Sequence, residues 1–187
     1  MRPRQPVLWL MTDERMGEAL WDALARLPRG AGVVFRHYQT PLPERRRLWA
    51  KAARVAKARG LVLVRAGPVR LGRGDAGTHG RRGSLTWPAH DRRQAIAGLR
   101  AGAKVLLVSP VCSTRSHPGR PALGLRAGGV GRGLPVSRIA LGGMDVRRFR
   151  RIKALGFDGW AAIDAWTAQG AQADGGSHNS TAFPSGS

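Results

Sequence analysis

The sequence predicts an α/β fold, a (β/α)8 TIM barrel in abbreviated form, and two observations support this prediction. Short apolar runs alternate along the chain with segments of helical periodicity. Most of these runs are apolar throughout, a pattern typical of parallel strands that are buried on both faces. Eight such runs fit one closed barrel, although the 187 residues are fewer than the ~200 that this fold usually needs.

Each expected strand is a β-rich apolar run bounded by turn residues or by a helical segment. The eight runs lie at residues 6–13, 32–39, 60–67, 76–80, 84–90, 104–111, 137–143 and 158–166. The fifth run is the least regular, because Pro88 cannot donate to a strand ladder.

Helical periodicity follows only some of these strands. One helix is expected between Met16 and Leu27, a second over 43–59, and a third from a capping box at Asp91 and Gln94 to Gly102. The helix after the seventh strand is expected to bury one face, with arginines on the other; that face consists of Val146, Phe149, Ile152 and Leu155. Glycine-rich or short connections predict that the third, sixth and eighth helices of the barrel are reduced.

Composition predicts one domain over residues 1–166 and a disordered tail over 167–187. The tail is rich in Gly, Ser and Ala and poor in hydrophobic residues. The single cysteine, Cys112, excludes an internal disulfide and favours a cytoplasmic location. The apolar stretch near the N-terminus is short and flanked by charges, so we expect a first strand, without a signal peptide or membrane span.

The net charge of +21 comes from 28 arginines and only four lysines. Selection for nucleic-acid binding produces this sign, and so does a coding bias that favours Arg, Ala, Gly and Pro together. The arginines are spread over the expected outer helix faces, without the interleaved aromatic residues of a stacking surface. We therefore favour a solvated basic surface, which still attracts RNA nonspecifically.

Several polar residues fall at or just after strand ends, the side of a TIM barrel where catalysis occurs. The histidines in such positions are His37, His79, His90 and His117. An inward Arg36 needs either an anionic ligand or a carboxylate partner, for which Asp13 is the candidate.

Two loops have the composition of phosphate sites. Residues 109–121 combine hydroxyls, cations, glycine and proline after the strongest strand, which suits either phosphate recognition or an ordinary solvated loop. Gly142 and Gly143 end the seventh strand, where a ligand phosphate could approach the backbone closely. The sequence shows no zinc, P-loop or dinucleotide-binding motif.

Several motifs occur in an order and spacing that resemble the thiamine phosphate synthase/TenI family over residues 7–166. They are LWLMTD, VVFRHYQ, GTHG, SPVCSTRSHPGRPALG, IALGGM and GWAAIDA. The resemblance implies a (β/α)8 barrel. It also implies a synthase that joins a hydroxymethylpyrimidine diphosphate to a thiazole phosphate, with release of pyrophosphate and a requirement for Mg²⁺. The TenI branch of the family includes a thiazole tautomerase.

The loop composition and the resemblance together predict the site residues. Catalytic roles are expected for Arg36, His79 and His117, and substrate or phosphate contacts for Thr114, Ser116, Gly142, Gly143 and Asp164. His117 occupies the position of a lysine in the family. The expected partners are phosphorylated small molecules.

This chain departs from the family pattern at several positions. Of the second-strand motif Gln-x-Arg-x-Lys, matched by residues 34–38, only Arg36 remains. Ala66-Gly67 replaces an Asn-Asp pair, Arg81-Arg82 stands where a magnesium-binding Asp is expected, and Asp164 replaces a serine. Mg²⁺ is implied by the family, but the expected carboxylate ligands are missing.

Three functions remain open from the sequence. The first is the thiamine phosphate synthase reaction, with arginines compensating for the metal. The second is a TenI-like thiazole phosphate tautomerase, or a degenerate barrel that binds a phosphorylated ligand without synthase activity. The third is a basic barrel whose partner is nucleic acid.

Overall fold

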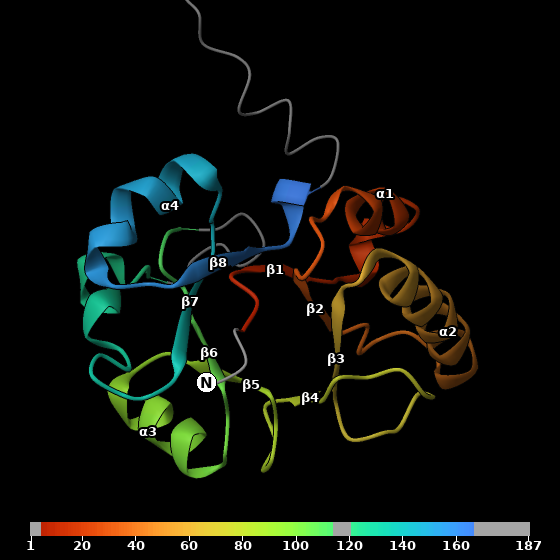
Figure 1. Cartoon of the computed structure of the whole chain (residues 1–187), viewed down its shortest axis with the longest axis horizontal. Coiled ribbons are helices and arrows are strands. Elements are labelled where there is room, and N and C mark those ends of the chain that lie inside the picture. The colour runs from red at the N-terminus through yellow and green to blue at the C-terminus, as the bar shows by residue number, and fades with distance from the viewer. Residues whose placement is uncertain (1–4, 114–120, 167–187) are drawn as a thin grey trace, which may run out of the picture.

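The computed structural model describes residues 5–113 and 121–166, in which eight parallel strands close into a barrel in chain order (Figure 1). The strands are β1 (Leu8–Met11), β2 (Gly32–Phe35), β3 (Val62–Ala66), β4 (Thr78–His79), β5 (Thr86–Ala89), β6 (Val105–Val108), β7 (Ser137–Leu141) and β8 (Gly159–Ala162). Each strand pairs with the next, and β8 pairs with β1. The predicted TIM barrel is confirmed.

The helices lie outside the ring of strands, as Figure 1 shows. They are α1 (Ala19–Arg26), α2 (Leu42–Arg59), α3 (Arg92–Arg100) and α4 (Val146–Ile152), with 3-10 turns η1 (Glu14–Met16), η2 (Gly124–Gly129), η3 (Lys153–Leu155) and η4 (Asp164–Trp166). No helix joins β3 to β4 within the described residues, and only η2 stands between β6 and β7. The reductions predicted for the third and sixth helices are therefore confirmed. The predicted disordered tail, 167–187, lies outside the described residues.

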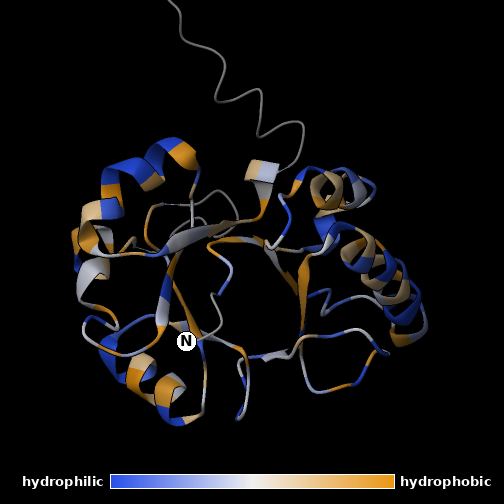
Figure 2. Cartoon of the chain, viewed as in Figure 1, coloured by the Kyte–Doolittle hydropathy of each residue, from blue (hydrophilic) through white to orange (hydrophobic). Residues whose placement is uncertain are grey.

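Alternation along the strands divides the core into a barrel interior and an outer layer. The inward cluster consists of Trp9, Met11, Val34, Val64, Ala66, Val105, Leu107, Ile139 and Ala161. Residues of the opposite parity, such as Leu10 and Phe35, pack under the helices. In Figure 2 the helices carry apolar residues on one side and polar residues on the other. This alternation fixes which residues beyond each strand point into the barrel mouth.

The helix after β7 differs from its sequence prediction at one position. Phe149, Ile152 and Leu155 pack against the outer core as expected, but Val146 is 48% exposed. Val146 is the first residue of α4, and Met144, two residues before it, is buried instead.

The capping box predicted at the start of α3 is half confirmed. Asp91 Oδ1 accepts a hydrogen bond from Gln94 N at 2.7 Å. Gln94 Oε1 accepts from His90 N at 2.9 Å, one residue before the expected donor. The helix start is thus still capped by two side-chain hydrogen bonds, one to a backbone N–H inside the helix and one to a backbone N–H before it.

Arg138 of β7 compensates for the missing sixth helix. Its buried guanidinium donates to five backbone carbonyls, those of Ala127, Gly128, Val130, Leu155 and Gly156. It also lies over the Phe157 ring, 4.8 Å from the centroid. One side chain therefore holds η2 and η3 against the barrel and satisfies carbonyls that a regular helix would bond internally.

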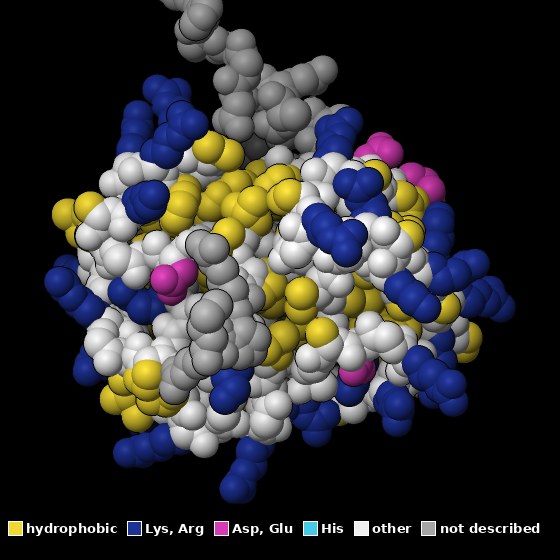
Figure 3. Space-filling model, in the orientation of Figure 1, with side chains coloured by type: hydrophobic (Ala, Val, Ile, Leu, Met, Phe, Trp, Pro, Cys, Tyr) yellow, Lys and Arg dark blue, Asp and Glu magenta, His cyan; other side chains and the backbone are white. Residues whose placement is uncertain are grey.

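Arginine and lysine side chains are distributed around the whole face that Figure 3 shows, with few carboxylates among them. This agrees with the predicted spread of charge over the outer elements. Among the described residues, no helix is long and apolar enough to cross a membrane.

Candidate functional site

The carboxyl ends of the strands bring polar side chains together at one mouth of the barrel. Asp13 and Arg36 lie two residues after the inward Met11 and Val34, and alternation points them inward too. His79 pairs in register with the inward Ala66. Arg36, His79 and Gly143 thus follow strand ends around the same mouth, where they were expected.

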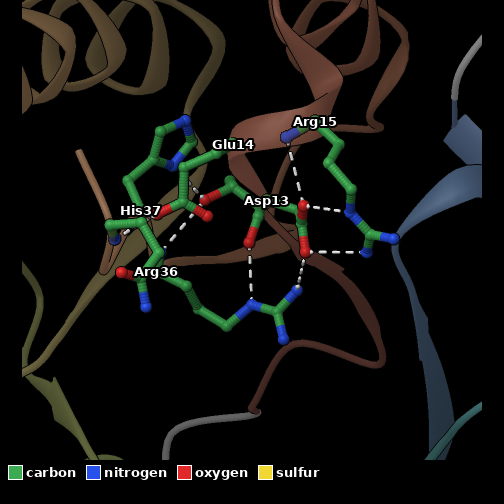
Figure 4. A network of polar contacts seen from close by, with 7 residues as sticks. Asp13, Glu14, Arg15, Arg36 and His37 are labelled. Carbon is green, nitrogen blue, oxygen red and sulfur yellow. Dashed lines mark hydrogen bonds and ion pairs between the residues drawn. The ribbon is translucent and has the colours of Figure 1, made fainter. Parts of the chain in front are cut away.

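Arg36 is held by Asp13, as Figure 4 shows, and by Thr12. Its Nε donates to Thr12 O at 2.7 Å, and its Nη2 donates to Asp13 Oδ2 at 3.3 Å. Nη1 has no partner among the described residues. The carboxylate alternative for Arg36 is therefore realised, while one face of the guanidinium stays available to an anion.

Asp13 is also bound by Arg15. Arg15 Nε donates to Oδ1 at 2.7 Å, and Nη2 donates to Oδ2 at 3.0 Å (Figure 4). Chiefly through the side-chain hydrogen bond from Arg15, and despite partial burial, the pKa of Asp13 falls to about 2. Asp13 thus pairs with two arginines, and nearby Glu14, whose Oε1 accepts from Gln39 N at 2.7 Å, adds a second negative charge to this edge of the mouth.

His37 anchors the chain just after Arg36. It has a left-handed backbone, with φ of 35°, and its buried ring stacks on Phe35 at 4.4 Å. Its Nδ1 lies 3.0 Å from Thr12 Oγ1, which also accepts from Arg36 N. Burial lowers the pKa of His37, so the ring is neutral at pH 7.

Arg45 of α2 fastens the ends of β2 and β3 together. Its Nη2 donates to Arg36 O at 2.7 Å and to Ala66 O at 2.8 Å. Its guanidinium also lies over the Tyr38 ring, 5.7 Å from the centroid. No sequence pattern indicates this role, because Arg45 lies in a run of three arginines whose other members are exposed.

His79 points into the barrel from β4. Its Nδ1 lies 2.9 Å from Thr86 Oγ1. Burial, aided by the charge of Arg36, lowers the pKa of His79 to about 4. A neutral imidazole at this place can accept or donate a hydrogen bond at pH 7, but it is a weak base.

His90, just after β5, has its tautomer fixed by the neighbouring strand. Its Nδ1 lies 2.6 Å from the carbonyl oxygen of Ser109, which can only accept. Nδ1 therefore carries the proton, and in the neutral ring Nε2 has a lone pair for a ligand. Register places His90 beside Ser109 at the mouth, because Ala89 pairs with Val108.

Gly142 and Gly143 both have positive φ, 99° and 58°. A Cβ on Gly143 would collide with Ser113 O, and one on Gly142 would lie 3.0 Å from Pro110 Cα. The chain's own segment after β6 thus occupies the Cβ side of both glycines. The glycines are needed for this backbone packing, whatever a phosphate does on the other side.

Arg148 adds a cation at this loop. It donates to Gly143 O and pairs with Asp145, Nε to Oδ2 at 3.6 Å. The sequence predicted that Arg148 lies on the outer face of the helix. The structure places it in the first turn, beside the strand end.

The remaining predicted site residues lie beyond what the structure describes. Thr114, Ser116 and His117 are outside the described residues, and so is the side chain of Asp164, which opens η4. Within the described ranges, no group of three His, Cys, Asp or Glu side chains could hold a metal ion. Both oxygens of Asp13 already accept from arginines, Oδ1 from Arg15 and Oδ2 from Arg15 and Arg36, so Asp13 does not suit Mg²⁺ either.

Known proteins match this chain in structure and not in sequence. No model of a protein family and no curated protein matches the sequence. Thiamine phosphate pyrophosphorylase from Pyrococcus furiosus is 17% identical, with a TM-score of 0.69 and coverage of 84% of this chain and 85% of that one.

Two further solved structures are similar at lower scores. FabK from Thermotoga maritima is 14% identical, with a TM-score of 0.59 over 87% of this chain and 59% of that one. The HpcH/HpaI aldolase from Desulfitobacterium hafniense is 12% identical, with a TM-score of 0.51 over 91% of both chains. At these identities the similarity shows the barrel fold, which several kinds of enzyme share.

Proposed function

We propose that this chain binds a phosphate ester of a small ring compound at the C-terminal mouth of the barrel and transfers a proton on it. The activity of this kind in the family that the sequence resembles is the TenI-like thiazole phosphate tautomerase. The observation that carries the proposal is the convergence on one mouth of a half-satisfied arginine, Arg36, and two inward histidines.

Arg36 supplies the anion site. Asp13 and Thr12 O hold two of its nitrogens and fix the plane of the guanidinium, while Nη1 is left for a phosphate oxygen. Because Asp13 also pairs with Arg15, it does not cancel the charge of Arg36 completely. A fixed, partly buried guanidinium is a strong receptor for a phosphate oxygen.

The histidines supply the proton transfer. His90 has a defined tautomer whose Nε2 can take a proton from one atom of the ligand ring and return it to another atom of that ring, so that the ligand is isomerised and His90 ends unchanged. His79 is neutral and can hydrogen-bond the ligand without adding charge. These residues do not fit Mg²⁺, so no step of the proposal runs through a metal.

A second candidate is the joining reaction of thiamine phosphate synthase. The likeness in fold to thiamine phosphate pyrophosphorylase from Pyrococcus furiosus favours it. Arg36 could stabilise departing pyrophosphate by charge alone. Arg81 and Arg82 lie elsewhere: Gly83 N donates to Ala101 O, at the end of α3 that leads into β6, so this turn is near the amino ends of the strands. This candidate needs a pyrimidine diphosphate as second substrate, which the first does not.

Isothermal titration with thiazole phosphate, hydroxymethylpyrimidine diphosphate and pyrophosphate tests the proposal. Arg36→Ala is expected to weaken binding of thiazole phosphate by about 1.5 to 3 kcal/mol, the scale of a charge-assisted hydrogen bond. Arg54→Ala, an exposed arginine of α2, is the matched control and should leave binding nearly unchanged. Equal losses in the two variants would show that the diffuse positive field binds the ligand, and would contradict the proposed site.

The reaction is followed by NMR as deuterium exchange from solvent into the thiazole phosphate. His90→Gln should abolish exchange while leaving binding within about threefold, since Gln keeps a hydrogen-bonding group but no base. Tight binding of the pyrimidine diphosphate and release of pyrophosphate would favour the second candidate.

A further inference from the structure

The segments that follow β2 and β3 expose three apolar side chains, of which Tyr38 lies near enough for the charge of Arg36 to act on it. Tyr38 is 53% exposed, Leu42 38% and Val69 39%. They make up half of the six large hydrophobic residues that are exposed in the described part of the chain. An apolar rim next to a phosphate-binding arginine suits a ligand with one apolar end and one anionic end.

Tyr38 is held in place on this rim. The residue before it, His37, is buried and stacked on Phe35, and its backbone is left-handed. These contacts fix the direction in which the chain continues to Tyr38. Arg45 lies over the Tyr38 ring. A Cβ built on Gly67 would lie 3.6 Å from Tyr38 Cε1, which places the ring over the ends of β2 and β3. A tyrosine whose ring is held by Arg45 on one face loses little conformational freedom when a ligand stacks on its other face.

We propose that Tyr38 is the specificity-determining residue of the mouth, and that its ring stacks on the aromatic ring of a monophosphorylated ligand whose phosphate is bound by Arg36. This inference rests on the proposed phosphate binding at Arg36. It adds that the ligand is an aromatic phosphate ester.

The positions of the two residues in the chain allow such a ligand. Tyr38 follows Arg36 by two residues, which span at most about 7 Å of chain, so both side chains start from the same segment after β2. Where the family motif has a lysine, this chain has Tyr38. A neutral aromatic ring at that position favours a ring of the ligand over a second phosphate.

Titration of four proteins with three ligands tests the inference. The proteins are the wild type, Tyr38→Phe, Tyr38→Leu and Val7→Ala, the last an exposed apolar residue just before β1, at the opposite end of the barrel. The ligands are thiazole phosphate, glycerol phosphate and inorganic phosphate. Tyr38→Leu should weaken thiazole phosphate about fivefold and leave the other two ligands within twofold, while Tyr38→Phe and Val7→Ala should resemble the wild type.

A second readout uses the fact that Tyr38 is the only tyrosine of the chain. With ring-labelled tyrosine, its NMR signal should shift upfield with thiazole phosphate and stay in place with inorganic phosphate, because only an aromatic ligand exerts a ring current. An unchanged signal at saturation with thiazole phosphate would overturn the inference.

The outcomes separate the two proposals. If the wild type binds no phosphate compound, or if Arg36→Ala loses no affinity, the proposed function fails and this inference falls with it. If inorganic phosphate binds through Arg36 but thiazole phosphate binds no tighter than glycerol phosphate, the proposed phosphate site stands and only the role of Tyr38 is wrong.

Discussion

At the scale of single residues, burial and neighbouring charge set the chemistry of the mouth. His79 is kept neutral by burial and by Arg36, with a pKa of about 4. Asp13 is kept ionised by Arg15 and Arg36, with a pKa of about 2. Both pKa values lie below those of the same groups in the unfolded chain, so both groups make stability depend on pH, in different windows.

The contribution of His79 is expected between pH 7.5 and 5. Its pKa in the unfolded chain is about 6.5, so in this range the unfolded state binds more protons than the folded state. The free energy of unfolding therefore falls on acidification, by about 2 kcal/mol from His79 at pH 5. Asp13 adds nothing here, because its stabilising contribution is lost only as the pH falls below about 4.

Urea unfolding of the wild type and of His79→Gln at the two pH values measures this effect. The variant should lose less stability on acidification than the wild type, and buried His37 should account for part of what remains. An identical loss in both proteins would show that His79 takes up its proton freely in the folded state.

At the scale of elements, the sequence predicted strands better than it predicted contacts. Long apolar runs such as residues 104–111 admit little besides a buried strand, and β6 formed there. The exposure of Val146 was missed because periodicity places residues on a face without showing where the helix leaves the core. Arg138 was missed because a lone arginine in a strand has no pattern, and its carbonyl partners come from two distant turns.

The candidate site shows the same division. Alternation along β1 and β2 was enough to bring Asp13 toward Arg36. The left-handed turn at His37 and the position of Arg45 depend on tertiary packing, which no local sequence signal carries.

The role of Arg138 gives a prediction at this scale. Arg138→Lys keeps the charge but cannot present a planar fork to five carbonyls, so we expect a loss of about 2 to 4 kcal/mol in the free energy of unfolding. Arg132→Lys, at an exposed position nearby, should change it by less than about 0.5 kcal/mol. Urea denaturation of both variants makes the comparison, and equal stability would mean that η2 and η3 stay packed on the barrel without the Arg138 hydrogen bonds.

At the scale of the whole molecule, the charge of +21 acts on every anion that approaches the protein. Arginines and lysines surround the face that Figure 3 shows, and acidic side chains are sparse between them. A field of this kind concentrates polyanions near the surface without fixing their position. Binding of nucleic acid and binding of a phosphate ester should therefore respond differently to salt.

Nucleic-acid binding by the diffuse field should be steep in salt and indifferent to any one arginine. If about five RNA phosphates are neutralised, affinity for a single-stranded oligonucleotide falls roughly a hundredfold between 50 and 200 mM NaCl. Arg36→Ala and Arg54→Ala should each weaken this binding slightly and equally, because each removes one of many charges. The thiazole phosphate makes one or two charged contacts and should lose less than about tenfold over the same range, with Arg36 alone decisive. Fluorescence anisotropy for the RNA and calorimetry for the ester give the two salt slopes. RNA binding that stays tight at 200 mM NaCl, or that depends on Arg36 more than on Arg54, would mean that the mouth of the barrel is itself a nucleic-acid site.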